Sequence, residues 1–387
     1  MLRTCSIPLT RDFRYTDAAE RVIQRGILTE GPETDRLEEE FAAWLGVEPE
    51  RVVAVSSGTS ALTALLRAHG IGLHPGELVA VPAFTFTATA LAVLRAGAEP
   101  YFVDVDESWS IDPSLLSIAV KGEPRIKAAI GVDLHGVPAA WAAIEEAVPD
   151  DLVLIEDACP AYGAFYGKRP AGTLGRSGAA FSLNESKQLP AGEGGLVVAP
   201  ADRATADIVR ALRRFGEFGQ NARELRIARL PGDNWKITEM AAAFARVGLD
   251  GLDARTEAGR YAGDVIRAAA RESGALKPHP IPHGAFPSWF KVRLEAPTSQ
   301  DADAASAWLA ERGVPIRAGD VAPLVEHPVF DRAPRGPIAQ ARAARRTILI
   351  GSRGKPVFGF DQEEADKLAQ VVISLPSKVS PWRRRNR

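Results

Sequence analysis

The chain has 387 residues, which is too long for one small hydrophobic core and predicts two closely packed domains. Lys and Arg (47) nearly balance Asp and Glu (49), so no overall charge attracts nucleic acid or an anionic membrane. Two cysteines build no disulfide framework, no apolar run has membrane-spanning length, and no secretion signal opens the chain, so we expect a cytoplasmic protein.

Seven short apolar runs between residues 51 and 200 alternate, over most of that length, with helical patterns. Most runs are continuous in hydrophobicity, which is typical of strands buried on both faces. The runs are Val52–Ser56, Leu78–Pro82, Tyr101–Val105, Ala128–Val132, Leu152–Ile155, Ala179–Ser182 and Leu196–Ala199. Helical patterns between the earlier runs, such as Ala61–His69 and Thr87–Ala96, predict a largely parallel sheet with right-handed crossovers. Little helix separates the last three runs, so we expect a mixed sheet.

The pattern changes after residue 250 and indicates a smaller α+β unit. A helical stretch over Leu252–Ser273 leads through a proline-rich link into a strand-like segment that starts at Trp289. A helix with its N-cap at Ser299 follows, and a last helix with a capping box is expected to begin near Asp361. The predicted domains are a large α/β domain over residues 1–254 and a small α+β domain over residues 255–387.

The first segment with chemical interest is a strand-to-helix junction, Ser57-Gly-Thr-Ser-Ala-Leu62. Backbone N–H groups at a helix N-terminus, which a ligand can approach closely because Gly58 has no side chain, form a site for a phosphate group. The same residues also make a good helix cap. This segment by itself therefore leaves a phosphate site and an ordinary cap as open alternatives.

The second segment is the end of the run Leu152–Ile155, which delivers two acids, Glu156 and Asp157. Ligands bind at the carboxyl ends of strands in open α/β sheets. A partly buried acid at that place needs a cationic partner or a protonated heterocycle. The alternative is a helix cap or an ion pair within the core.

The third segment carries a lone lysine, Lys187, between the predicted strand Ala179–Ser182 and the glycine-rich return Gly192-Glu-Gly-Gly195. A lysine held beside a sheet edge with a lowered ammonium pKa can form a Schiff base with an aldehyde cofactor. Most lysines are solvated surface charges, so only the neighbouring motifs favour this role. The fourth segment, Gly232–Met240, is a polar turn before a helix and alone predicts no more than a capped helix start.

Together, the four segments match the requirements of one cofactor. Pyridoxal phosphate needs an anion site, an acid for its pyridine nitrogen, a lysine for its aldehyde and a flat apolar face for its ring. The chain offers a candidate for each requirement. The six histidines show no metal-ligand spacing, so we expect no metal site.

The chain resembles the DegT–StrS family of sugar aminotransferases over nearly its whole length. The matching segments are Gly26-Ile-Leu-Thr-Glu-Gly-Pro32, Ser57-Gly-Thr-Ser-Ala-Leu62, Pro82-Ala-Phe-Thr-Phe-Thr-Ala88, Glu156-Asp-Ala158, Lys187 with Gly192-Glu-Gly-Gly195, and Asn234-Trp-Lys-Ile-Thr-Glu-Met240. Several motifs in the same order are specific, whereas any one of them alone is not. The resemblance implies fold type I with a mostly parallel sheet of about seven strands, and a homodimer with shared active sites.

The resemblance also implies roles for the matching residues. Lys187 would hold pyridoxal 5'-phosphate as a Schiff base and then move the proton of the substrate carbon, while Asp157 would keep the pyridine nitrogen protonated. The other implied cofactor contacts are Phe86 on the ring face, Ser57, Gly58, Thr59 and Ser182 at the phosphate, and Asn234 from the partner subunit. The implied reaction moves an amino group from L-glutamate or L-glutamine to a nucleotide-linked keto-deoxyhexose or a keto cyclitol, in antibiotic or surface-polysaccharide biosynthesis.

The sequence departs from the family pattern beside the pyridinium acid. Pro160 stands where the family has Gln or His, and proline has no N–H to donate, so we expect Asn184 or His135 to contact the ring oxygen, unless the pocket is altered. A stretch after residue 313 resembles the branch that dehydrates keto-deoxy sugars, but that branch has His in place of Lys187. Two alternatives therefore stay open, namely another reaction of the same cofactor on an amino or keto acid, and a sensor protein without turnover.

Overall fold

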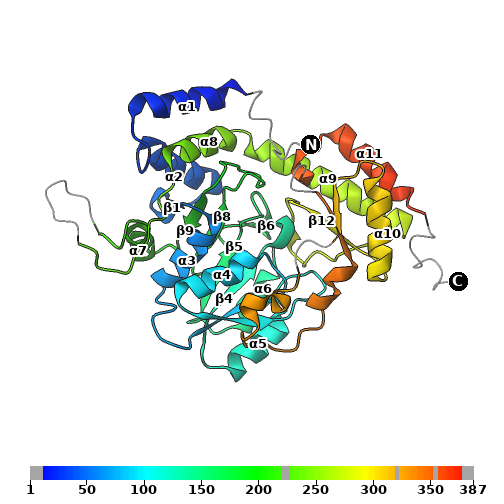
Figure 1. The fold of residues 1–387 in the computed structure, drawn as a ribbon, viewed down its shortest axis with the longest axis horizontal. Coiled ribbons are helices and arrows are strands. Elements are labelled where there is room, and N and C mark those ends of the chain that lie inside the picture. Colours follow the sequence, from blue (N-terminus) through cyan, green and yellow to red (C-terminus); the bar gives the residue numbers. More distant parts are fainter. Residues whose placement is uncertain (1–11, 219–226, 319–321, 352–355, 377–387) are drawn as a thin grey trace.

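The structure of the protein is a computed structural model that describes residues 12–218, 227–318, 322–351 and 356–376. A central sheet lies in the middle of the molecule, and a smaller sheet with its own helices lies at one side (Figure 1). Within the described ranges, no helix is long and apolar enough to cross a membrane. The architecture is the α/β class that the alternation of strands and helices predicts.

The central sheet has seven strands in the order β1-β9-β8-β5-β4-β2-β3. Their bounds are β1 (Val52–Val55), β2 (Leu78–Pro82), β3 (Glu99–Val103), β4 (Ile126–Val132), β5 (Val153–Asp157), β8 (Ala179–Ser182) and β9 (Gly195–Val198). All seven predicted runs are confirmed as strands. β9 runs antiparallel to its neighbours β1 and β8, while the other pairs of this sheet are parallel. The expectation of a mixed sheet is therefore also confirmed.

Helices cover both faces of this sheet. One face packs against α3 (Gly58–Ala68), α4 (Thr87–Ala96) and α7 (Arg203–Arg213), and the other against α2 (Pro32–Leu45), α5 (Pro113–Gly122), α6 (Trp141–Ala147) and α8 (Glu239–Leu249). The N-terminal α1 (Phe13–Arg25) packs on α8. Successive strand residues face opposite sides, so Leu154 and Ile155 belong to different core clusters. Polar groups can therefore meet a ligand at the strand ends and not on the covered faces.

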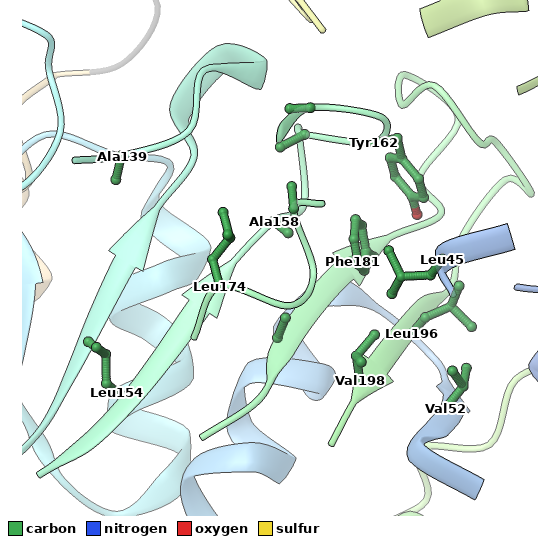
Figure 2. Close-up of a cluster of buried hydrophobic side chains, with 14 of the residues drawn as sticks. Leu45, Val52, Ala139, Leu154, Ala158, Tyr162, Leu174, Phe181, Leu196 and Val198 are labelled. Atoms are coloured by element: carbon green, nitrogen blue, oxygen red, sulfur yellow. The ribbon is translucent and has the colours of Figure 1, made fainter. Parts of the chain in front are cut away.

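An aromatic cluster on the face covered by α2 fixes the position of β8 (Figure 2). The ring centre of Phe181 lies 5.2 Å from that of Phe41 on α2 and 4.7 Å from that of Tyr162. Leu196 of β9 lies beside Phe181 in the same cluster. Full burial of one such side chain contributes about 2 kcal/mol. This packing holds the end of β8, and with it the turn that follows Ser182.

The C-terminal part contains a four-stranded antiparallel sheet in the order β10-β12-β14-β13. Its elements are β10 (Lys277–Pro278), β12 (Val292–Glu295), β13 (Ile316–Ala318), β14 (Thr347–Ile350), α9 (Leu252–Ser273), α10 (Ser299–Ala310) and α11 (Gln362–Ile373). A three-stranded sheet of β6 (Phe165–Tyr166), β7 (Arg169–Pro170) and β11 (Ala285–Phe286) connects it to the large part. Residues after 321 also return to β3, where Gly336 donates its N–H to the Phe102 carbonyl. The division predicted at 254/255 falls in the first turn of α9 and stays a prediction.

Two predicted details of the C-terminal part are wrong, and one is confirmed. The N-cap of α10 is Thr298 rather than Ser299, because Thr298 has extended backbone angles and its side chain accepts from the Asp301 N–H. The strand predicted from Trp289 begins only at Val292, because Trp289 has a φ of +47°, which a strand does not accommodate. The capping box at Asp361 is present as predicted.

Candidate active site

The predicted site residues come from strand ends that lie side by side. β5 and β8 are parallel neighbours, and β1 and β8 both run antiparallel to β9, which lies between them. The carboxyl ends of β1, β5 and β8 therefore open on the same edge of the sheet. Ser57 follows β1, Asp157 ends β5, and Ser182 ends β8. Three of the four segments singled out from the sequence thus meet where an open α/β sheet binds ligands.

Two glycines allow these strand ends to approach one another. A Cβ on Gly58 would lie 2.8 Å from Cys159 Sγ and 3.0 Å from Ser182 Cβ. A Cβ on Gly195, in β9, would lie 2.4 Å from the carbonyl of Ser57. Neither position accepts a side chain unless its neighbours move. The first turn of α3 therefore faces a cradle of small residues.

The chemistry of this cradle fits a phosphate group. Ser57 caps α3, and its Oγ accepts from the Ser60 N–H at 3.1 Å. The backbone N–H groups of Gly58 and Thr59 have no acceptor within the part of the chain that the structure describes. Ser182 Oγ accepts from the Asn184 N–H at 3.4 Å, which leaves the hydroxyl proton for another acceptor. Free N–H groups, a hydroxyl and the positive end of a helix form an anion site.

Asp157 is buried beside this cradle, with only 5% of its surface exposed. Thr89 Oγ1 donates to one carboxylate oxygen at 2.8 Å, and the Cys159 N–H donates to the other at 3.2 Å. No described Lys, Arg or His forms an ion pair with it. A buried carboxylate that neutral donors orient and no cation balances is suited to a cationic ligand group, such as a protonated pyridine nitrogen.

The turn that supplies Thr89 also presents an aromatic ring. Phe86 is the N-cap residue of α4, and 65% of its surface is exposed. The Thr89 N–H donates to the Phe86 carbonyl at 3.1 Å, so the ring and the donor to Asp157 belong to one turn. An exposed aromatic ring beside a polar site can stack on a flat heteroaromatic group.

Lys187 lies on the turn between β8 and β9, half-buried, with its Nζ 4.7 Å from the ring centre of Phe290. Its charge also acts on Cys159. Burial and then the nearby Asp157 raise the pKa of the Cys159 thiol well above its usual range, and Lys187 opposes that rise. The three side chains therefore lie close enough to interact electrostatically. Cys159 stays a neutral thiol, which agrees with its interpretation as a small packing group rather than a nucleophile.

The residue that stands out beside Pro160 is Gln188, which the sequence did not single out. Gln188 is completely buried directly after Lys187, and its Nε2 donates to the Pro160 carbonyl at 2.9 Å. This hydrogen bond joins the segment after Asp157 to the lysine turn. The only sign of this residue in the sequence is that it follows Lys187 directly. That position does not reveal that its partner is the Pro160 carbonyl.

The two residues expected to replace the missing contact at Pro160 have other neighbours in the structure. Asn184 Nδ2 donates to Glu193 at 2.8 Å, and Asn184 Oδ1 accepts from Ser186. The His135 ring lies 3.3 Å from Arg293, at the junction with the C-terminal part. A contact of Asn184 or His135 with the cofactor's ring oxygen therefore stays a prediction.

The structure does not bring Asn234 together with the other site residues of its own chain. Asn234 is exposed and forms an isolated bridge with Arg214. The next residue, Trp235, accepts from the Ser56 N–H at 2.7 Å, so this segment passes beside the junction of β1 and α3. The role of Asn234 across a subunit boundary stays a prediction.

Glu239, five residues after Asn234, organises the N-terminal segment near this site. Its buried carboxylate accepts from the backbone N–H groups of Gly31 at 2.9 Å, Glu33 at 2.8 Å and Thr34 at 3.0 Å. A carboxylate is favoured at the N-terminus of α2 for this reason. The partners are more than 200 residues away in sequence, so no local pattern predicts the contact.

Comparison with known proteins gives consistent matches over the whole chain. Residues 11–352 match the family model described as DegT/DnrJ/EryC1/StrS aminotransferase family. A Streptomyces venezuelae protein named dTDP-3-amino-3,4,6-trideoxy-α-D-glucose transaminase is 34% identical over 343 residues, 86% of each chain. A Saccharopolyspora spinosa protein named dTDP-4-dehydro-2,3,6-trideoxy-D-glucose 4-aminotransferase is 31% identical over 384 residues, 95% of this chain and 96% of that protein.

A solved structure supports the same assignment. The crystal structure of a DegT DnrJ EryC1 StrS aminotransferase from Brucella abortus superposes with a TM-score of 0.82 at 27% identity, over 96% of this chain and 98% of that one. The residues that fit a phosphate, a pyridinium and an aldehyde all lie inside the matched range. The chain belongs to the DegT/DnrJ/EryC1/StrS aminotransferase family and is, like its relatives, an aminotransferase that depends on pyridoxal 5'-phosphate.

Proposed function

We propose that this aminotransferase moves an amino group from L-glutamate or L-glutamine to a keto sugar, either a nucleotide-linked keto-deoxyhexose or a keto cyclitol. It would act in antibiotic or surface-polysaccharide biosynthesis, as a cytoplasmic homodimer whose active sites are shared. The names of two relatives over most of the chain, both dTDP-sugar transaminases, support the substrate class. Those names refer to amination at C3 in one case and at C4 in the other, so the carbon is left to experiment.

The observation that carries the proposal is the environment of Asp157. Its carboxylate is buried, oriented by Thr89 and the Cys159 N–H, and has no cationic partner among the described residues. Such a group favours the protonated form of a ligand nitrogen placed against it. Transamination needs a protonated ring nitrogen, because the ring must accept the electrons released at the substrate carbon.

The residues of the chain then have separate tasks. Pyridoxal phosphate, when bound, supplies an aldehyde and an electron-accepting ring. Asp157 holds the proton on the ring nitrogen, and the N–H groups of Gly58 and Thr59 hold the phosphate. Lys187 would hold the aldehyde carbon until the amino donor arrives, and its amine would then be free. That amine would take the proton from the donor's α-carbon and, in the second half-reaction, deliver one to the carbon of the acceptor.

The first test is the visible absorption spectrum of the purified protein with its cofactor, before and after addition of L-glutamate or L-glutamine. We expect the visible absorption band of the bound cofactor to disappear and the spectrum of the pyridoxamine form to replace it. The Lys187→Ala variant should lack the visible band, whereas a control variant of the exposed Lys168 should retain it. A band that does not respond to either donor would indicate a different reaction of the same cofactor, and the proposal would fail.

The shared active site has its own test, because Lys187 and Asn234 would come from different subunits. Mixed dimers of a Lys187→Ala chain and an Asn234→Ala chain contain one site with both residues intact. In an equal mixture that is unfolded and refolded together, about half of the dimers are mixed, and each has one intact site of two. The two poorly active proteins should therefore recover about a quarter of the wild-type activity. If the mixture stays as inactive as its components, Asn234 does not complete the partner's site.

A further inference from the structure

A small cavity lies at the junction between the central sheet and the C-terminal part. Its volume is about 20 Å³, and its lining includes Trp109 and His135 from the large part and Arg267, His279 and Trp289 from the C-terminal part. The Phe290 ring, which contacts Lys187 Nζ, follows Trp289 directly, and the Phe290 N–H donates to the His135 carbonyl at 2.8 Å. One layer of residues therefore separates the cavity from the lysine turn.

Backbone strain is concentrated around this cavity. Among the described residues, five that are not glycine have a positive φ, and three of these line the cavity: Trp109 (69°), His135 (61°) and Trp289 (47°). Each such conformation costs of the order of 1 kcal/mol, and residues of this kind gather at ligand sites. The concentration of three in one place indicates that the geometry of this junction is maintained for a purpose other than packing.

His279 lines the cavity and carries a ring N–H that nothing in the described chain accepts. Trp109 Nε1 donates to His279 Nδ1 at 2.8 Å, so the ring proton of His279 lies on Nε2. Burial, and then the charges of Arg293 and Arg267, hold the pKa of His279 well below its usual range, so the ring is neutral. His279 is 7% exposed, and its Nε2 is buried without a partner among the described residues.

Arg267 also lines this cavity and carries donors that nothing in the described chain accepts. It is 4% exposed, and its guanidinium lies 4.8 Å from the ring centre of Trp289. It forms no hydrogen bond or ion pair with any described residue. Asp264, a nearby carboxylate, accepts instead from Trp289 Nε1 at 3.2 Å. Burial, and then Arg271, lower the pKa of Arg267 to about 10.

A largely buried arginine and a buried imidazole N–H without acceptors are costly unless an anion or water joins them. We propose that this cavity binds one small monoanion, of the size of a halide ion, through Arg267 and His279. The volume excludes a phosphate or sulfate, since about 10–15 Å³ on the same scale holds a single water. The anion is a free inorganic ion, because the Phe290 layer separates the cavity from Lys187, where the amino-acid donor must bind.

Crystals of the holoenzyme soaked in sodium bromide test the site directly. We expect an anomalous peak between the Arg267 guanidinium and His279 Nε2. The Arg267→Gln variant should lose the peak, while Arg271→Gln, on an exposed arginine of the same helix, should retain it. A water molecule in place of the peak, at bromide concentrations that label other sites, would overturn the proposal.

A second measurement needs neither crystals nor a folded variant. The melting temperature of the wild-type holoenzyme should rise saturably by a few degrees in sodium bromide, relative to sodium gluconate at equal ionic strength. Equal melting temperatures in the two salts would count against an anion site. The anomalous peak and the melting temperature do not depend on turnover. The anion site can therefore be established even if the proposed transamination fails, and transamination can be established even if the anion site is absent.

Kinetics of the half-reaction with L-glutamate test whether the anion site is separate from the donor site. Bromide should raise the melting temperature and leave KM for L-glutamate and kcat unchanged. A several-fold rise of KM in bromide would show that the ion binds where the donor binds, and the proposal would fail.

Discussion

Glu156 and Asp157 are neighbours at the end of β5, yet they lie in two opposite environments. Asp157 faces the side of α3 and α4, where Thr89 and a backbone N–H orient it toward the cofactor cradle. Glu156 faces the side of α2 and accepts from the backbone N–H groups of Gly172 at 2.6 Å and of Leu174 at 2.7 Å. Asp157 is therefore available to a ligand, whereas both oxygens of Glu156 accept hydrogen bonds from the protein's own backbone.

The difference extends to protonation. Glu156 lies next to a third acid, Asp133, at the end of β4. Burial, and then the charge of Glu156, raise the pKa of Asp133 well above its usual range, so Asp133 keeps its proton. Asp133 Oδ1 accepts from the Ala139 N–H and from Trp141 Nε1, both at 2.9 Å. Two acids at one strand end thus differ in function because different segments lie over the two faces: α4 supplies Thr89 to Asp157, and the loop after β7 supplies backbone N–H groups to Glu156.

The largest effect is expected on the Asp157 side. Asp157→Asn removes the charge that keeps the ring nitrogen protonated but retains the shape of the side chain. We expect kcat to fall by about 10²–10⁴-fold, with the melting temperature of the apo-protein changed little. A variant that turns over at the wild-type rate would show that the carboxylate does not act on the cofactor.

Glu156→Gln should have the opposite profile. The backbone N–H groups of Gly172 and Leu174 each donate to one oxygen of the Glu156 carboxylate. An amide has only one oxygen, so its NH₂ group would face one of these donors and a hydrogen bond to a buried charge would be lost. We expect the free energy of unfolding to fall by about 3 kcal/mol, while kcat per mole of bound cofactor stays near the wild-type value. Urea denaturation and a cofactor-normalised assay measure the two quantities. A large fall in kcat without loss of stability would remove the contrast between the two acids.

Asp133→Asn should change how stability depends on pH. Asp133 has a raised pKa in the folded protein, so its stabilising effect is complete below about 3.8, its usual value, and is lost as the pH rises above that. Asn imitates the protonated acid at every pH. The free energy of unfolding, measured from pH 5 to 8, should therefore favour the variant increasingly as the pH rises, by up to about 1.4 kcal/mol per pH unit. A difference that does not vary with pH would mean that Asp133 is ionised in the fold.

The smallest expected effect belongs to Thr89, which only orients Asp157. Thr89→Val keeps the volume and removes the hydrogen bond to Oδ2 of the carboxylate. A lost bond of this kind is worth about 1 kcal/mol, so we expect kcat to fall by roughly 3- to 10-fold. Thr89→Ser should restore most of the loss. If Ser does not restore it, the role of Thr89 is packing rather than orientation of Asp157.

The sequence by itself determined the seven strands of the central sheet and the positions of its catalytic candidates. Continuous apolar runs arise because these strands are buried on both faces, and burial leaves a local pattern. Lys187 and Asp157 could be located because Asp157 lies at the end of such a run and Lys187 on the turn after another, and ligands bind at those ends. The segments together pointed to one cofactor, and the role of each residue came from the resemblance to a family whose match the comparisons confirmed.

The family resemblance implied Asp157 as the acid of the cofactor, but without it only the tertiary structure decides which of the two acids on β5 faces the cofactor cradle and which supports the core. Alternation along a strand shows that Glu156 and Asp157 point to opposite faces, but the partners on those faces come from distant segments. The same holds for the junction cavity, where Trp109 and His279 are 170 residues apart. Contacts of that range depend on how whole elements pack, and hydrogen bonds between such elements leave no periodic pattern in the sequence.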